Sequence, residues 1–193
     1  MTSELRGTRF SHIVGFDDCP FSRDHRGDVS FIGAIYSGRR LEGVVSGKVR
    51  RDGVNSTREL IRLVRDSKFA GHLQLVMLQG IALAGFNVVD VEKLHETLGI
   101  PVLVIARYAP RREAIRKALL EHVPAGARKW RLIERLGPME PLAGIYVQRR
   151  GLDREEASAV IRATAINGVI PEPLRTAHLI AGGITDGESR GRT

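Results

Sequence analysis

The hydrophobic pattern of the first fifty residues predicts three consecutive strands. Residues 11–16, 29–36 and 41–48 are apolar runs of strand length, and the short connection between the last two contains Ser37-Gly38-Arg39. A short connection that contains glycine is typical of a hairpin between antiparallel strands. The first run ends in two acidic residues, Asp17 and Asp18. We therefore expect a three-stranded meander with two carboxylates at the end of its first strand.

Beyond residue 50 the pattern alternates between helix and strand. Helical spacing of apolar residues predicts helices over residues 56–68, from Val91 with Asp90 as N-cap, over 111–121, around Trp130, from Asp153 to Ala165, and from Pro173 to Gly182-Gly183. Residues 73–78 and 101–106 are typical of buried strands, and residues 143–148 of an edge strand. A meander followed by this alternation favours an α/β fold whose mixed sheet has three antiparallel strands, then parallel strands, and helices on both faces.

This order of elements matches the ribonuclease H-like fold. The competing doubly wound dinucleotide fold needs G-x-G-x-x-G after the first strand, whereas residues 15–20 here read GFDDCP. A chain of 193 residues suits one compact domain. We expect a single ribonuclease H-like domain over residues 1–183 and a polar C-terminal tail over residues 184–193.

The charge favours a polyanionic partner. The chain holds 30 Lys and Arg against 22 Asp and Glu, a net charge of +8, and 25 of the basic residues are Arg. Guanidinium groups pair bidentately with phosphate, which indicates nucleic acid, although a solvated basic face needs no ligand. Aromatic residues make up only 5% of the chain, which argues against an extended base-stacking platform. A groove that follows the phosphate backbone is the better hypothesis.

Other protein classes are excluded by what the chain lacks. The single cysteine, Cys19, forms no internal disulfide or multi-cysteine metal site, and the acidic pair before it should raise its thiol pKa and disfavour a nucleophilic role. The N-terminal MTSELRGTRF has no apolar run of a signal peptide, and the longest apolar stretch, residues 73–89, is interrupted by polar amides. We expect a cytoplasmic protein with no membrane partner.

Three places carry candidate chemistry. The adjacent carboxylates of Asp17 and Asp18 repel each other, so Mg²⁺ or Mn²⁺ would stabilise them, with a solvated pair in a turn as the alternative. Glu59 closes an S-x-x-E string, which predicts a helix capping box. In the string IPEPLRTAH, Arg175 and His178 lie one helical turn apart, where they could address a phosphate or a metal.

The strings GFDD, QGIALAGFNVVD and IPEPLRTAHLI, taken together, resemble an archaeal family of unknown function that is related to endonuclease V. The resemblance to the archaeal family covers nearly the whole chain, and the link to endonuclease V rests on short motifs in the same order. Endonuclease V is a magnesium-dependent nuclease of ribonuclease H-like fold that cuts near deaminated bases, notably inosine. The resemblance thus implies the fold expected above and a nuclease ancestry.

The resemblance also implies roles for single residues. Asp17 matches the metal ligand on the first strand, Glu59 matches the Glu of a Phe-Arg-Glu motif, and His178 ends the proline-rich P-E-P-x-R-x-A string. Arg107 stands where the enzyme has a lysine thought to serve catalysis. The implied catalytic residues are Asp17, Glu59, Arg107 and His178, and the implied ligands of Mg²⁺ or Mn²⁺ are Asp17, Glu59, Gln79, His178 and Asp18.

The main departure from endonuclease V is Gln79. The nuclease has an essential Asp-Gly where this chain has Gln79-Gly80, and an amide oxygen brings no charge to a cation. The aromatic wedge of the enzyme is absent from residues 48–53, and its His-Pro-Arg element is replaced at residues 83–87, so the resemblance does not imply inosine specificity. Arginines near the acidic residues in sequence would border a phosphate path: Arg50, Arg51, Arg58 and Arg175.

Two hypotheses follow. The first is metal-dependent phosphodiester cleavage in DNA or RNA, in which Arg107 neutralises charge in the transition state. The second is a nuclease fold that binds nucleic acid without cleaving it. Gln79 is the residue that distinguishes them, because a two-metal mechanism depends on anionic ligands.

Overall fold

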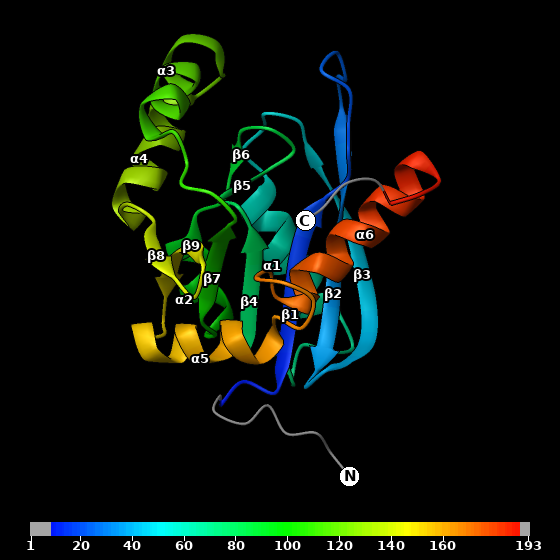
Figure 1. Ribbon diagram of the computed structural model, residues 1–193. Coiled ribbons are helices and arrows are strands. Elements are labelled where there is room, and N and C mark those ends of the chain that lie inside the picture. The colour runs from blue at the N-terminus through cyan, green and yellow to red at the C-terminus, as the bar shows by residue number, and fades with distance from the viewer. Residues whose placement is uncertain (1–8, 190–193) are drawn as a thin grey trace.

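A seven-stranded mixed sheet lies at the centre of the structure, a computed structural model that describes residues 9–189 (Figure 1). Its strands lie in the order β3-β2-β1-β4-β7-β9-β8. The strands of this sheet are β1 (His12–Asp18), β2 (Asp28–Ser37), β3 (Arg40–Arg50), β4 (Leu75–Gln79), β7 (Val102–Ala106), β8 (Glu140–Leu142) and β9 (Ile145–Arg150). A separate two-stranded hairpin, β5 (Ala82–Leu83) and β6 (Asn87–Val88), follows β4.

The strand directions confirm the predicted architecture. β1, β2 and β3 form an antiparallel meander, and β4 and β7 then run parallel to β1. The prediction for residues 143–148 is wrong in one respect. β9 is an interior strand, because the short strand β8 pairs with its outer side and forms the edge.

Six helices in the described part of the chain cover both faces of the sheet (Figure 1). They are α1 (Ser56–Asp66), α2 (Val91–Leu98), α3 (Arg112–His122), α4 (Gly126–Leu136), α5 (Arg154–Thr164) and α6 (Glu172–Asp186). Helices α1 and α2 share a core with Val14 and Phe16, and α5 and α6 share one with Ile13. Side chains alternate along a strand, so these cores mark the α1 face and the α6 face of the sheet.

The predicted caps at Asp90 and Asp153 are confirmed, since each side chain accepts a hydrogen bond from the first turn of its helix. The predicted end of the last helix is wrong. Helix α6 continues through Gly182-Gly183 and ends before Gly187, whose φ of 81° is the left-handed conformation that terminates helices. Gly182 is buried inside the helix. Residues 184–186 of the expected tail are therefore helical, residues 190–193 lie outside the described range, and the domain division stays a prediction.

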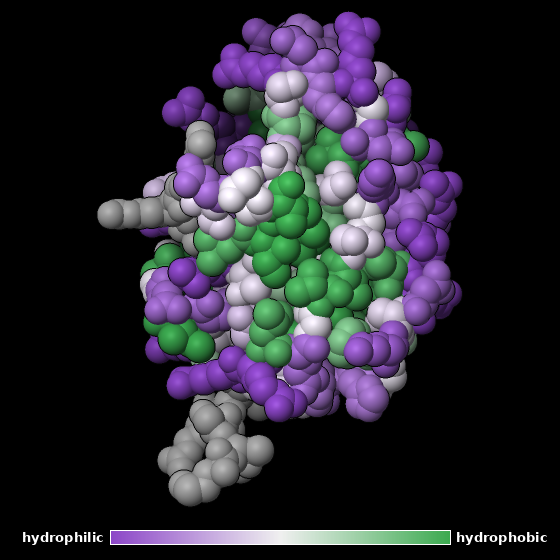
Figure 2. All heavy atoms as spheres, turned by 90° about the vertical axis from the view of Figure 1, so that its right-hand side faces the viewer, coloured by the Kyte–Doolittle hydropathy of each residue, from purple (hydrophilic) through white to green (hydrophobic). Residues whose placement is uncertain are grey.

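The edge strand β3 lies on the side of the molecule that faces the viewer in Figure 2. Apolar side chains gather on this side, and β3 contributes exposed Leu41 and Val44. The strand also carries charged side chains and a register irregularity opposite Ile35–Tyr36, two features that protect sheet edges from further pairing. In the described residues no helix has the length and apolar character needed to cross a bilayer.

The packing of α6 on β1 depends on a glycine. A Cβ added to Gly15 would lie 2.5 Å from the carbonyl carbon of Pro173 and 2.6 Å from the backbone nitrogen of Leu174. Only a residue without a side chain lets the first turn of α6 approach the strand so closely. Gly15 thus sets the position of α6, including the residues farther along this helix.

Replacing Gly15 tests this contact. We expect Gly15→Ala to lower the free energy of unfolding by about 1–3 kcal/mol, because the overlap is with backbone that cannot rotate away. Urea denaturation followed by circular dichroism measures the change. The matched control is Gly71→Ala, where an added Cβ meets no atom within 4 Å. A Gly15→Ala chain as stable as the control would contradict the close packing.

Candidate functional site

Asp17 and His178 form a hydrogen-bonded pair at the carboxyl edge of the sheet. Asp17 is buried near the end of β1, and α6 brings His178 to it so that Nδ1 lies 2.8 Å from Oδ2. The other carboxylate oxygen of Asp17 accepts the backbone N–H of Asp18. The hydrogen bond to Asp17 raises the pKa of His178 above its ordinary value, against the opposing effect of burial. The protonated imidazole is thus stabilised beside a buried carboxylate.

Gln79 lies next to Asp17 on the neighbouring strand. The parallel register pairs Phe16 with Leu78, so the following positions, Asp17 and Gln79, are neighbours that project toward the α6 face. Gln79 ends β4 and is partly exposed, and its side chain forms no hydrogen bond with another described residue. The amide is therefore available at the same edge as the Asp17–His178 pair.

Asp18 points away from Asp17, toward the α1 face, because side chains alternate along β1. Its Oδ2 accepts the backbone N–H of Ala84, at 2.9 Å, in the turn between β5 and β6. Burial, and then the negative charge of Asp17, raise the pKa of Asp18 to about 6. Asp18 thus links the end of β1 to the β5–β6 hairpin and carries a charge that its surroundings disfavour.

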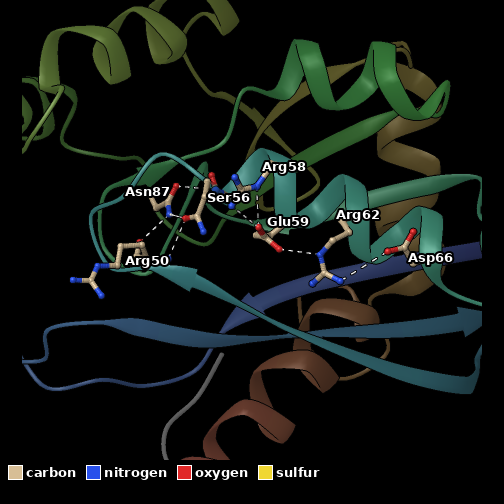
Figure 3. Close-up of polar contacts among 8 residues, drawn as sticks. Arg50, Ser56, Arg58, Glu59, Arg62, Asp66 and Asn87 are labelled. Carbon is tan, nitrogen blue, oxygen red and sulfur yellow. Dashed lines mark hydrogen bonds and ion pairs between the residues drawn. The ribbon is translucent and has the colours of Figure 1, made fainter.

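Glu59 belongs to a different ion-pair group. It lies in the first turn of α1, where its carboxylate accepts hydrogen bonds from Arg58 and Arg62 (Figure 3). Burial alone would raise the pKa of Glu59, but these two arginines outweigh it and lower the pKa. Among the described residues no hydrogen bond or ion pair joins Glu59 to Asp17, Asp18 or His178. Glu59 thus has its own arginine partners in this structure, and its role as a metal ligand stays a prediction.

The predicted capping box at Ser56 is wrong. The N-cap of α1 is Asn55, which makes no side-chain cap, and the hydroxyl of Ser56 donates to the carbonyl of Val88 instead. Figure 3 shows the reason, since Asn87 from β6 lies over this helix start and accepts the N–H of Ser56. The start of α1 is therefore stabilised by a tertiary hydrogen bond with Asn87 rather than by the predicted local capping box.

The four arginines predicted to border a phosphate path differ in solvent exposure and in the groups with which they pair. Arg50 and Arg58 are exposed, with side-chain exposures of 62% and 76%. Arg51 donates to two backbone carbonyls of the loop that follows β1, and Arg175 pairs with the acid one turn earlier in α6. Arg50 and Arg58 thus reach solvent, although Arg50 lies 3.9 Å from Asp28 and Arg58 pairs with Glu59, whereas Arg51 and Arg175 mainly hold their own segments.

An apolar pocket of about 400 Å³ adjoins this edge. Gly80, directly after Gln79, lines it together with residues from the β5–β6 hairpin, the loop after β7, and α4. Its polar or aromatic lining includes Arg112, Trp130, Tyr146 and Gln148. Sequence reasoning missed this pocket because its lining comes from five separate segments with no common motif.

Lys129 holds one wall of this region and was also missed. It is a buried lysine of α4 whose ammonium group donates to the carbonyl of Asp52, 2.5 Å away. The carboxylate of Asp52 in turn accepts the N–H of Phe86 in the hairpin. Burial lowers the pKa of Lys129. The one sign of this contact in the sequence was a lysine at an apolar position of a predicted helix. In the structure Lys129 joins α4 to the loop between β3 and α1.

The pH dependence of folding stability tests the raised pKa of Asp18. Its folded pKa, about 6, exceeds the value of 3.8 expected for an unfolded chain, so the folded state binds this proton more tightly. Stability should therefore fall as pH rises from about 4 to 6 and stay low above that range. Asp18→Asn, which can still accept the N–H of Ala84, should be more stable than the parent at pH 7.5, by up to about 3 kcal/mol.

Thermal denaturation at pH 4 and pH 7.5 measures this effect. The difference between Asp18→Asn and the parent should shrink as pH falls through 6 and vanish near pH 4. If Asp18→Asn and the parent differ in stability by the same amount at both pH values, the folded structure does not disfavour the charge of Asp18.

The chain matches known proteins over nearly its whole length. The family model described as Endonuclease dU matches residues 9–185. A UPF0215 protein from Deinococcus radiodurans is 63% identical over 184 residues, covering 95% of this chain and 94% of the relative. A second from Methanothermobacter thermautotrophicus is 39% identical over 93% of this chain and 90% of the relative.

Solved structures agree with the fold. A protein of unknown function from Archaeoglobus fulgidus has a TM-score of 0.83 at 32% identity, over 90% of this chain and 97% of that one. Endonuclease V from Ciona intestinalis, crystallised with inosine-containing DNA, has a TM-score of 0.57 at 14% identity, over 88% and 83%. The resemblance seen in the sequence is confirmed, and the chain belongs to the Endonuclease dU family, whose fold is similar to that of endonuclease V.

Proposed function

We propose that this protein is a divalent-metal-dependent endonuclease that cleaves a phosphodiester bond of DNA near a deoxyuridine nucleotide. The observation that carries the proposal is the buried Asp17–His178 pair, at the sheet edge beside Gln79 and an apolar pocket. The family description supports deoxyuridine as the target, and the fold is shared with a nuclease solved on DNA. The net charge of +8 suits a polyanionic substrate.

The donor atoms at this edge suit one hard cation. Within residues 9–189, no three His, Cys, Asp or Glu side chains are already arranged as a metal site. Asp17 and Gln79, which project toward the same face of the sheet, nevertheless offer the carboxylate and amide oxygens that Mg²⁺ and Mn²⁺ prefer. Asp18 adds to the negative charge at this edge, and its pKa is raised by burial and then by the charge of Asp17, so a cation at Asp17 would offset part of this repulsion. Asp17 and Gln79 would hold the ion, which when bound would supply Lewis-acid activation of water and of the leaving oxygen.

His178 has a defined orientation for proton transfer. Its Nδ1 faces Asp17, and its Nε2 forms no hydrogen bond with another described residue. The hydrogen bond to Asp17 raises the pKa of His178 and so stabilises the imidazolium, whose Nε2–H would donate a proton to the departing oxygen. The ligand role predicted for His178 would require the neutral imidazole instead. Asp17 acts in either case by fixing the ring and the tautomer.

The apolar pocket suits an extruded base. Enzymes that act beside one particular base commonly rotate that nucleotide out of the stack into a pocket. This pocket is within the usual size range of ligand sites and contains few polar groups, among them the buried amide of Gln148. Since Gly80 lines the pocket and Gln79 ends β4, a base in the pocket would place its phosphate near the Asp17 edge.

Cleavage of a labelled duplex with a single deoxyuridine tests the function. With Mn²⁺ or Mg²⁺ the parent should cut this strand and not the matched thymidine strand. Asp17→Asn and His178→Ala should each reduce the rate at least about 100-fold, because each loses the pair that orients the general acid. The matched control is His122→Ala, an exposed histidine on α3. Cleavage by Asp17→Asn at the parental rate would refute the assignment.

Gln79 separates this function from the second candidate, a nucleic-acid-binding protein without turnover. The uncharged amide beside Asp17 favours the second candidate, because it lowers the number of anionic ligands. If the site is otherwise intact, Gln79→Asp should bind Mn²⁺ at least about tenfold more tightly, since it adds a carboxylate beside Asp17. Calorimetric titration with Mn²⁺ measures this. Salt-dependent DNA binding without cleavage by either form would establish the second candidate.

A further inference from the structure

Tyr108 is the exposed aromatic residue of this protein. The chain has ten aromatic residues, six Phe, three Tyr and one Trp, and all of them lie within the described range. Nine are buried or partly buried, whereas Tyr108 is 74% exposed. An aromatic ring gains from burying its large apolar surface, so Tyr108 offers a stacking surface to a partner that reaches it.

The position of Tyr108 connects it to the candidate site. It lies directly beyond β7, whose Ile105 pairs with Gln79 of β4. Its neighbours Ala106, Ala109 and Pro110 line the apolar pocket, but Tyr108 itself does not. The ring therefore stands outside the pocket, on a segment that lines it, and at the same edge of the sheet as the Asp17–His178 pair.

The charge around Tyr108 suits a nucleic-acid backbone. Residues 107–135 contain nine basic and three acidic residues, so this segment carries +6 of the net charge of +8. The guanidinium of Arg107 lies 5.7 Å from the centre of the Tyr108 ring. The exposed side chains of Arg111, Arg128 and Arg131 form no ion pair with any described residue. A polyanion is thus attracted to the segment that presents the ring.

We propose that Tyr108 stacks on a nucleobase of the bound strand, next to the nucleotide whose base enters the pocket. The inference rests on the proposed function, since it takes nucleic acid as the substrate. Extruding a base leaves its neighbour without a stacking partner, and an exposed side chain at that point commonly replaces the lost contact. One aromatic ring suffices for this role, which agrees with the scarcity of aromatic residues in the chain.

Binding of a deoxyuridine duplex without divalent metal tests the proposal, with fluorescence anisotropy as the measurement. Tyr108→Ala should weaken binding roughly tenfold or more, while Tyr108→Phe keeps the parental affinity because stacking needs only the ring. The slope of log K against log salt should not change, because no phosphate contact is lost. The matched control is Leu41→Ala, an exposed apolar residue at the opposite end of the sheet.

A second substrate distinguishes stacking from a structural role. When abasic sites replace the bases that flank deoxyuridine, parent and Tyr108→Ala should bind equally well. Parental affinity of Tyr108→Ala on the intact duplex, or a loss that persists on the abasic duplex, would overturn the proposal.

The outcome for Tyr108 is separable from the outcome for the nuclease. If the parent binds DNA but never cuts it, the difference in DNA affinity between Tyr108→Ala and the parent still tests the stacking proposal. If the parent cuts DNA and Tyr108→Ala binds as the parent does, the stacking proposal alone fails. Absence of DNA binding by the parent at low salt would refute both.

Discussion

The hydrogen bond between Asp17 and His178 is the interaction on which the carboxyl edge of the sheet depends. A buried carboxylate is unfavourable unless a charged or hydrogen-bonding partner faces it, and here that partner comes from a helix 161 residues later. The partner reaches Asp17 because Gly15 lets the start of α6 lie against β1. Strand, helix and site are therefore coupled, and a change in the packing of α6 is also a change in the orientation of His178.

The same edge holds charge that does not favour folding. Burial and the proximity of Asp17 raise the pKa of Asp18 to about 6, so its ionised form destabilises the folded chain at neutral pH. An aspartate in place of Gln79 would bring a third negative charge to this edge. The uncharged amide of Gln79 thus avoids further electrostatic repulsion at this edge. Unfavourable charge kept at a cleft is typical of functional sites.

The two faces of the sheet contribute different parts of the site. Asp17, Gln79 and His178 belong to the α6 face, whereas Asp18 turns toward the α1 face and holds the β5–β6 hairpin that lines the pocket. Lys129 and Asp52 fix the far wall of the same region. The pocket and the Asp17–His178 pair are connected at the strand ends, because Gly80 of the pocket follows Gln79, the neighbour of Asp17. Tyr108 lies at the same edge of the sheet because it comes two residues after the end of β7.

Hydrophobic periodicity by itself determined the meander, the two buried parallel strands and the helices, because each of these depends on local spacing of apolar residues. Motif order in the sequence also indicated Asp17, Gln79 and His178, which the sheet register and α6 bring to one edge. Only the tertiary structure decided the rest. At the start of α1, contacts with Asn87 and Val88 take the place of the predicted capping box at Ser56, and two arginines pair with Glu59. The strand β8 pairs with the outer side of β9, and segments that are distant in the sequence form the pocket. Each of these outcomes is a competition between a local preference and a contact from elsewhere in the chain, and the energy of that contact cannot be read from local sequence.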